Sequence, residues 1–322
     1  MKLSALLFAA LGALTLAAPA QAQDWPARPV RIVAPFAPGG TADTLGRIAA
    51  DQLSEALKGQ FVVENRGGAG GLLGTAAVAN ADPDGYTLVV SGIATHVIGP
   101  SVSANAGFDP MKNFTHIAYF GGPPNIIIVH PSLGVKSMKE LLELGKKTKD
   151  GISYVSPGPG TLGHVVLDSW AKKEGVKFEH IPYKGAGQAI TDLIAGHVKV
   201  GSMTWTTAGT QIRGGKVIPL AVSSENRLAE FPDIPTLKEL GYPDLVAITW
   251  FSLSAPAGTP KEIVERLNRE VVKLMAKPDV QKRLAHEAIE TKAMTPDEFT
   301  KFVEAEIGRW GPVAKAMGAG AN

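Results

Sequence analysis

Residues 152–164 read ISYVSPGPGTLGH, in which an apolar run leads into a glycine-rich loop and then into a helix-like run. Gly158, Gly160 and Gly163 form the pattern G-x-G-x-x-G. A second strand-like run follows, and Glu179 lies about 20 residues past the first glycine. This order of strand, glycine turn, helix, strand and acid is typical of dinucleotide-binding folds. The stretch therefore predicts a β-α-β unit with an anion-binding loop, and an NAD-dependent oxidoreductase is one function that fits it.

A second loop of the same design lies near the N-terminus, in residues 30–46, VRIVAPFAPGGTADTLG. Glycines let the backbone approach a ligand closely, and the start of the following helix offers unpaired N–H groups and the positive end of its dipole. Thr41 and Thr161 are expected near the two helix starts, where a hydroxyl either caps the helix or donates to a ligand. One such loop is enough for a dinucleotide, whereas two predict a pair of anion-binding loops facing a cleft. We therefore favour a binding protein for a small anion over the NAD-dependent enzyme.

The strands and helices expected along the chain fall into two units. Residues 30–92 alternate strand, helix, strand, helix, strand, which is typical of a parallel sheet with helices on both faces. The same alternation restarts in the middle of the chain, and two apolar segments join the units. We expect an α/β protein of two domains, each a mainly parallel sheet flanked by helices, with the ligand cleft between them. Domain 1 would comprise residues 23–126 and 247–322, domain 2 residues 127–246, and the C-terminal helices would pack on domain 1.

The first 22 residues have the form of a cleavable signal peptide. Lys2 precedes an apolar run, and Ala20 and Ala22 place small residues at the spacing that signal peptidase requires. We expect cleavage after Ala22 and export of a soluble protein to the periplasm. The chain has no cysteine, so it has neither disulfides nor an N-terminal cysteine for a lipid anchor. The formal net charge of +2, from 32 basic and 30 acidic residues, gives no support for a nucleic-acid partner.

The sequence carries none of the common catalytic motifs that we sought, namely G-x-S-x-G, H-E-x-x-H and G-x-x-x-x-G-K-[ST]. The seven histidines show no metal-like spacing, so we expect no metal site and no bound cofactor. Ser156 and His164 could serve as nucleophile and base of a hydrolase, but their separation across a loop and a helix start gives no reason to expect a hydrogen bond. We expect Ser156 to donate to a ligand, His164 to pack or cap in the first helical turn, and the protein not to be an enzyme.

Five segments appear in a characteristic order: PFAPGGTADTLGR, VVENRGGAGGLLGTAAVANADPDGYTL, YVSPGPGTLGHV, IPYKGAGQAITDLIAGHV and SAPAGTP. Together they resemble the substrate-binding proteins of tripartite tricarboxylate transporters, the Bug receptors, over nearly the whole chain after the signal peptide. The resemblance implies a two-domain periplasmic binding fold of the second type, which closes by hinge bending on a small carboxylate. It also implies that the ligand passes to integral-membrane transporter subunits, or that the receptor signals to a sensor kinase. We expect a monomer.

The resemblance also implies which residues contact the ligand. The first loop would contribute Phe36, Gly39, Gly40 and Thr41, and the second loop Ser156, Gly158, Gly160, Thr161 and His164. The segment PYKG would place Tyr183 and Lys184 near the cleft, and Ser91 and Thr95 follow the third strand. Lys184 is either the counter-charge of the carboxylate or a solvated surface lysine. Asp43 would repel an anion, so we interpret it as a structural acid in the first turn of a helix.

One departure from the family pattern bears on the ligand. The family usually has an acidic residue in the segment after the AGHV helix end, and an ungapped count places Met203 at that position. An acid there could pair with an ammonium group, whereas Met203 and the nearby Trp205 cannot. We therefore expect a carboxylate that is not an amino acid, with an apolar or aromatic body packed against Phe36, Met203 or Trp205. Trp205 could equally be a packing residue of the core.

Overall fold

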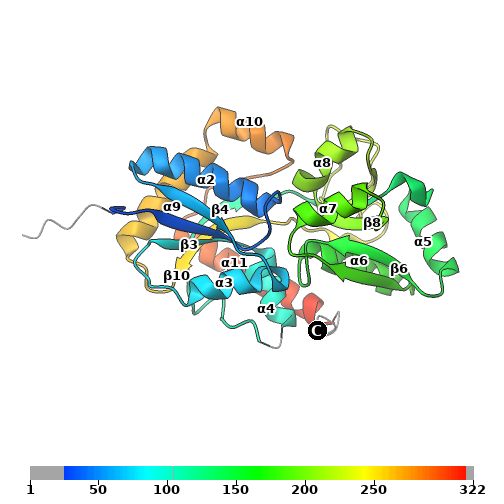
Figure 1. Cartoon of the computed structure of the whole chain (residues 1–322), viewed down its shortest axis with the longest axis horizontal. Helices are drawn as coiled ribbons and strands as arrows, with labels where there is room; N and C mark the ends of the chain where they lie inside the picture. Colours follow the sequence, from blue (N-terminus) through cyan, green and yellow to red (C-terminus); the bar gives the residue numbers. More distant parts are fainter. Residues whose placement is uncertain (1–24, 104, 317–322) are drawn as a thin grey trace, which may run out of the picture.

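The computed structural model describes residues 25–103 and 105–316 of the chain. The predicted signal peptide and its cleavage site after Ala22 lie outside the described residues. Figure 1 shows two halves side by side, each with its own sheet, as the alternation of strands and helices predicts. Within the described residues, no helix is both long and apolar enough to cross a membrane.

The first sheet has five strands in the order β2-β1-β3-β10-β4. These strands are β1 (Val30–Ala34), β2 (Phe61–Asn65), β3 (Thr87–Gly92), β4 (Phe114–Gly121) and β10 (Phe251–Pro256). Strand β1 pairs in parallel with β2 and β3, whereas β10 is antiparallel to both β3 and β4. All the strands except β10 therefore run in one direction, which confirms a mainly parallel sheet.

The second sheet repeats this arrangement, in the order β7-β6-β8-β5-β9. Its strands are β5 (Asn125–Val129), β6 (Ile152–Ser156), β7 (Phe178–Pro182), β8 (Val200–Thr204) and β9 (Ile218–Val222). Here β5 is the antiparallel strand, between β8 and β9. In each sheet the antiparallel strand is thus the segment that has just crossed from the other half.

The chain crosses between the sheets twice, once between β4 and β5 and once between β9 and β10. The sequence analysis divides the halves after residue 126, but β5 already begins at Asn125, which pairs with Thr204 of the second sheet. That boundary therefore cuts a strand that belongs wholly to the second sheet. The prolines at 123 and 124, which cannot donate to a strand ladder, mark the crossing itself.

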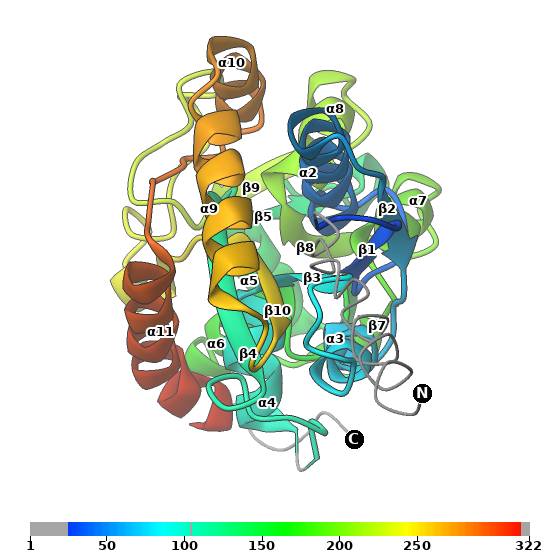
Figure 2. The same cartoon turned by 90° about the vertical axis from the view of Figure 1, so that its left-hand side faces the viewer.

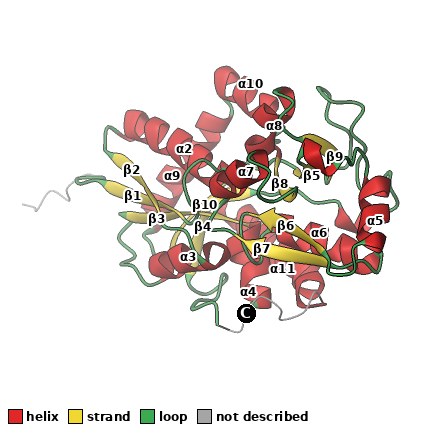
Figure 3. Ribbon diagram, turned by 45° about the vertical axis from the view of Figure 1, so that its right-hand side comes forward, coloured by secondary structure: helices red, strands yellow, loops and turns green. Residues whose placement is uncertain are grey.

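Helices cover both faces of each sheet (Figure 3). The first half contains α2 (Thr41–Leu57), α3 (Leu72–Ala79), α4 (Gly99–Val102), α9 (Lys261–Met275), α10 (Pro278–His286) and α11 (Pro296–Ala316). The second half contains α5 (Met138–Lys147), α6 (Leu162–Lys173), α7 (Ala186–Ile194) and α8 (Trp205–Arg213). Single helical turns occur at Ala69–Gly71, Ala94–Ile98, Pro131–Leu133 and Pro243–Leu245.

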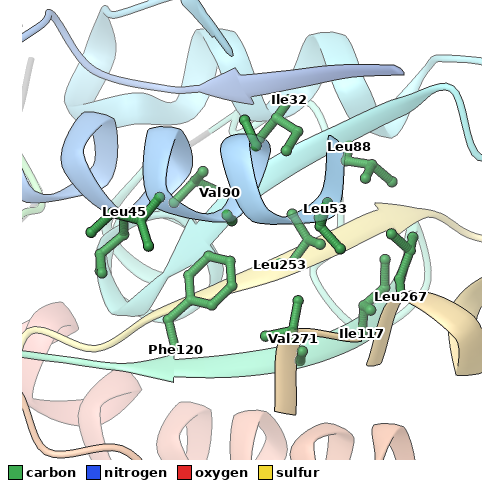
Figure 4. Packing of buried hydrophobic residues seen from close by; sticks show 14 of the residues in the cluster. Ile32, Leu45, Leu53, Leu88, Val90, Ile117, Phe120, Leu253, Leu267 and Val271 are labelled. Atoms are coloured by element: carbon green, nitrogen blue, oxygen red, sulfur yellow. The ribbon is translucent and has the colours of Figure 1, made fainter. Parts of the chain in front are cut away.

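The core of the first half lies between its sheet and the helices α2 and α9 (Figure 4). Leu45 and Leu53 of α2 meet Leu267 and Val271 of α9 over the apolar face of the strands, and all four side chains are buried. The apolar residues of α2 recur at helical spacing, which is why this segment forms an amphipathic helix. The later helices α9 and α11 contact β4 of the first sheet, as predicted for the C-terminal part of the chain (Figure 2).

Candidate functional site

A cavity lies between the two sheets, where the parallel strands β1, β3, β6 and β8 end and the antiparallel strands β5 and β10 begin. The ladder places Phe251 opposite Gly92 and Asn125 opposite Thr204, so the first residues of β5 and β10 reach the same edge. Ligands of α/β proteins commonly bind at the carboxyl ends of parallel strands. The cavity is therefore the candidate ligand site.

The wall of the cavity is mostly carbon, with hydroxyls and one amide between the apolar groups. Among the described residues that line it, none carries a charged side chain. About 40 Å³ is open to the centres of water-sized molecules, whereas one water needs roughly 10–15 Å³ on that measure. The cavity as it stands therefore has room for a few waters, and a larger ligand requires the two halves to separate or side chains to shift.

Six of the residues predicted from the sequence line this cavity: Phe36, Gly40, Thr41, Ser91, Thr95 and Thr161. They lie at or just after the carboxyl ends of three strands, β1, β3 and β6, with Ser91 still inside β3. The structure thus brings both glycine-rich loops and the loop after the third strand to one place. Ser91 is fixed from behind, because its Oγ lies 2.7 Å from Oγ of both Ser252 and Ser254 on β10.

Four helix starts meet at the cavity, those of α2, α6, α7 and α8, and none is capped by a side-chain hydrogen bond. The sequence places Thr41 near the start of α2, either as a cap or as a donor to the ligand, and in the structure Gly40 holds the cap position while Thr41 is the first helical residue. Its Oγ1 instead lies 2.9 Å from Oγ1 of Thr204, on the other side of the cavity. Thr161 does hold the cap position of α6, but its hydroxyl donates to the carbonyl oxygen of Gly158 at 2.7 Å. The first-turn N–H groups of both helices therefore stay free of a side-chain acceptor.

The second glycine loop is held by two stacked imidazoles. The ring centroids of His164 and His180 lie 4.1 Å apart. Nδ1 of His164 accepts the N–H of Gly160 at 3.2 Å, so His164 packs against the loop and does not cap α6. Nε2 of His180 lies 2.7 Å from Oγ of Ser156. Burial, and then the neighbouring His164, lower the pKa of His180 to about 3.

These contacts indicate that Ser156 has a structural role in the second glycine-rich loop. The side chain is fully buried, does not line the cavity, and contacts His180 and the loop backbone. The sequence analysis expects it to donate to a ligand, and the structure does not bring it to the cavity. A histidine with so low a pKa is also a poor general base at neutral pH. The geometry therefore gives no support to a serine hydrolase.

Glycines of the two halves touch where the loops meet. A Cβ built on Gly70 would lie 1.9 Å from the carbonyl oxygen of Pro159, and one on Gly160 would lie 3.1 Å from Cα of Gly99. Nearby, the N–H of Ala37 donates to the carbonyl oxygen of Lys184 at 2.9 Å. Gly158 belongs to the same contact, because a Cβ built on it would lie 3.3 Å from Cα of Gly70. Gly158 and Gly160 thus serve the contact between the halves and do not line the cavity.

Other predicted residues also lie away from the cavity. Gly39 and Tyr183 line a separate outer groove beside α7 and α8, where the hydroxyl of Tyr183 donates to Asp192. The side chain of Lys184 is exposed and does not reach the cavity, so its position matches the surface alternative. His164 lies behind the second loop.

Met203 and Trp205 belong to the hydrophobic core of the second half. Met203 is fully buried and does not line the cavity, because alternate residues of a strand point to opposite faces. The cavity residue of this turn is Thr204, one position later. Trp205 packs against Phe231, with ring centroids 5.2 Å apart. The prediction that either side chain packs on the ligand is therefore not supported by their positions.

Asp43 has the contacts of a structural acid. Its carboxylate accepts the N–H of Gly39 at 3.1 Å and the amide of Asn65 at 3.0 Å, and it pairs with Arg47 at 2.9 Å. Burial by itself would raise the pKa of Asp43, but these hydrogen bonds hold the pKa below its usual value. The carboxylate ties the first loop to α2 and β2 and does not line the cavity.

The sequence analysis misses several residues that line the cavity. They are Ala42, Val90, Gly92, Ile93, Ala94, Asn125, Pro157, Leu162, Ala186, Thr204, Thr249, Trp250 and Phe251, and Gly163 of the glycine pattern lines the cavity as well. Ala42 and Leu162 directly follow the predicted Thr41 and Thr161, so the helix-start argument could have included these two. Asn125, Trp250 and Phe251 are different, because only the antiparallel direction of β5 and β10 brings them here. The crossing prolines before Asn125 were the available signal.

Comparison with known proteins gives a consistent result. The family model described as the tripartite tricarboxylate transporter family receptor matches residues 45–319. BugT from Bordetella pertussis is 33% identical over 305 residues, which cover 94% of this chain and 94% of that protein. Rpa4515 of R. palustris, solved with adipate, is 33% identical with a TM-score of 0.87, over 91% of this chain and 98% of the other. MatC from Rhodopseudomonas palustris, solved with bound malate, is 29% identical with a TM-score of 0.86, over 90% and 100%.

Proposed function

Because this chain belongs to the tripartite tricarboxylate transporter receptor family, we propose that it captures a small organic carboxylate between its two halves and delivers it to integral-membrane transporter subunits. Proteins of this family are solute-binding receptors, and the two-sheet fold is that of their solved structures. The protein acts by binding and closure, without chemistry on its ligand. Signalling to a sensor kinase would use the same binding step.

The observation that supports this function best is the convergence of uncapped helix starts on a cavity without charged side chains. A carboxylate can be bound by the first-turn N–H groups and the positive end of each helix dipole. Hydrogen bonds to a charged group contribute about 1.5–3 kcal/mol each. Two helix starts from opposite halves suit a ligand that bridges them, which links binding to closure.

The lining also supports a ligand class. Among the described lining residues there is no acid to pair with an ammonium group, so we propose that the ligand is not an amino acid. Phe36, Leu162 and Trp250 offer apolar walls for a hydrocarbon body. Adipate and malate, the ligands solved with two relatives, are the first dicarboxylates to try.

We further propose where the protein works and how it is divided. The first 22 residues would direct export to the periplasm, with cleavage after Ala22, and the mature protein would act as a monomer. The two domains would correspond to residues 23–126 with 247–322 and residues 127–246, adjusted so that all of β5 joins the second domain. Hinge bending at the two crossings would open and close the cleft.

A dinucleotide enzyme fits the structure less well. The loop that carries Gly158 and Gly160 is covered by backbone of the other half, at Gly70 and Gly99. Glu179, the acid that would hold a ribose, is exposed on β7 and does not line the cavity. The third glycine of the pattern, Gly163, lets α6 approach β8, because a Cβ there would lie 2.2 Å from the carbonyl oxygen of Ser202.

The proposed function is tested by identifying ligand retained on the purified protein by mass spectrometry. Calorimetry with mono- and dicarboxylates and with aspartate and glutamate follows. We expect a carboxylate without an amino group to bind and to raise the melting temperature, since ligand at about 100 times Kd adds roughly 2.7 kcal/mol of stability. Preferred binding of aspartate or glutamate would contradict the ligand class, and a thermal shift with NAD but with no carboxylate would contradict the receptor function.

A further inference from the structure

Asn125 is the first residue of β5, immediately after the chain crosses between the halves, and it also lines the cavity. Its side chain is almost fully buried, at 2% exposure. A polar side chain in this position faces the ligand space on one side and the hinge on the other. The proposed function does not assign it a role.

The backbone of Asn125 is tied to the return crossing. Its N–H donates to Oγ of Ser223 at 2.8 Å, and its carbonyl oxygen accepts the N–H of Ser223 at 2.8 Å. Ser223 in turn donates its hydroxyl to the carbonyl oxygen of Ala247 at 2.7 Å. Asn125, at the end of the first crossing, is therefore linked through Ser223 to the second crossing at Ala247. A ligand that binds its side chain is thus coupled to the hinge.

The side chain makes one hydrogen bond, from Nδ2 to Oγ of Ser202 at 2.7 Å. This leaves Oδ1 beside the start of α6, where a Cβ on Gly163 would lie 3.4 Å from it. Ser202 is fully buried, and in the described part of the chain its hydroxyl has no acceptor for its own hydrogen. A half-turn of the amide would satisfy that hydrogen, because Ser202 would then donate to Oδ1, and the amide nitrogen with its two hydrogens would take the place of Oδ1 beside the start of α6.

A carboxylate in the cavity selects between these two orientations. An amide oxygen facing a carboxylate oxygen brings two acceptors together, which is unfavourable. The turned amide instead donates a charge-assisted hydrogen bond to the ligand and keeps the contact with Ser202. Among the described lining residues, none of which carries a charged side chain, Asn125 has the only carboxamide that can donate to a carboxylate.

We propose that the side-chain amide of Asn125 donates to a ligand carboxylate, and that this contact sets the preference for an anionic group at the hinge side of the cavity. The inference rests on the proposed function. A ligand held by Asn125 and by the helix starts of α2 and α6 is bound to the hinge and to both halves at once. A ligand with a hydroxyl or other donor at this position would instead keep the amide as it stands.

The test compares calorimetric affinities of adipate and malate, each used singly, for the wild type and Asn125→Asp. The substitution keeps the shape of the side chain but replaces the donors by a carboxylate, so we expect at least a 100-fold loss of affinity. Asn113→Asp is the matched control, because it adds the same charge before β4, outside the cavity lining, and should bind like the wild type. Asn125→Ala, which removes the donors without adding charge, should lose about 10-fold or more.

The outcomes separate the two proposals. If the wild type binds either acid and Asn125→Asp binds it as tightly or more tightly, the amide does not donate and the inference is wrong while the receptor function stands. If the wild type binds no carboxylate at all, both are wrong. If Asn125→Asp does not fold, as judged by its thermal unfolding, Asn125→Ala decides, and affinity equal to the wild type overturns the inference.

Discussion

Two kinds of helix start can be compared in this protein. At α5, Oγ of Ser137 accepts the N–H of Glu140 at 3.2 Å, and the Glu140 carboxylate accepts the N–H of Lys136 at 2.7 Å. At α11, Thr295 and Glu298 satisfy each other's backbone N–H groups in the same way. The starts of α2 and α6, at the cavity, have no side-chain cap although threonine is present at both.

The difference lies in what the hydroxyls do. Capping by Ser or Thr normally contributes about 1 kcal/mol to stability. At the cavity, Thr41 bonds to Thr204 across the two halves and Thr161 donates to its own loop. The first-turn N–H groups are thereby left for an acceptor that is not part of the chain. The starts of α3, α4, α9 and α10 belong to neither kind, because they have no side-chain cap and do not line the cavity.

The largest loss of ligand affinity is expected from a substitution at the contact between the two halves, which brings the uncapped starts of α2 and α6 together. Gly70→Ala would place a methyl group 1.9 Å from the carbonyl oxygen of Pro159, which the two halves can avoid only by staying apart. We expect at least a 100-fold loss of carboxylate affinity, measured by calorimetry.

Gly215→Ala is the control for this substitution. Gly215 has the same φ of 64° as Gly70, and no described atom lies within 4 Å of a Cβ built there. Both variants therefore carry the same left-handed strain, about 1 kcal/mol, but only one has a clash between the halves. Equal affinities of the two variants would show that contact of the loops is not needed for binding.

Lowering the pH should destabilise the glycine-rich loop before α6, because the imidazoles of His164 and His180 hold this loop in place. The start of α5 has no such imidazole contact among the described residues. His180 has a pKa of about 3 in the folded protein, against about 6.5 unfolded. The unfolded chain then binds the extra proton as the pH falls below 6.5, so this contribution to stability is complete above pH 6.5 and declines toward pH 3. Between pH 7 and pH 4.5 this one group should cost about 2.7 kcal/mol.

The measurement is urea unfolding of the wild type and His180→Gln at both pH values. Glutamine can still hydrogen-bond to Ser156, as donor or as acceptor, but does not titrate. Asp168 near His164 and the neutral Tyr154 are the other titratable groups around the pair, and both remain in the variant. Equal losses of stability in the two proteins would mean that His180 is not kept neutral by its surroundings.

The smallest effects should be opposite at the two kinds of helix start. Ser137→Ala should lower the free energy of unfolding by about 1 kcal/mol and leave ligand affinity unchanged. Thr41→Val should leave the stability of the ligand-free protein nearly unchanged and lower affinity about 5-fold, because the bond to Thr204 joins the halves. Calorimetry and urea unfolding of both variants check this, and a stability loss at Thr41 equal to that at Ser137 would indicate an ordinary cap.

Much of this arrangement can be predicted from the sequence. The alternation of strands and helices gives two sheets, and the glycine loops place Thr41 and Thr161 near the cavity. The predictions that fail are those that depend on the direction of a strand or on the face of the strand from which a side chain projects. A one-residue difference along β8 separates the buried Met203 from the cavity residue Thr204. Asn125 reaches the cavity only because β5 is antiparallel, and Lys184 contributes its carbonyl oxygen to a contact where its charge was expected.

The central claim is that the uncapped helix starts bind the ligand carboxylate. Amide NMR during titration with a carboxylate that binds tests it most directly. We predict downfield shifts of the amide protons of Thr41, Ala42, Leu162 and Gly163, while those of Lys136 and Glu140 at the capped start of α5 stay in place. Saturable binding that leaves the first-turn amides of α2 and α6 unmoved would contradict the account.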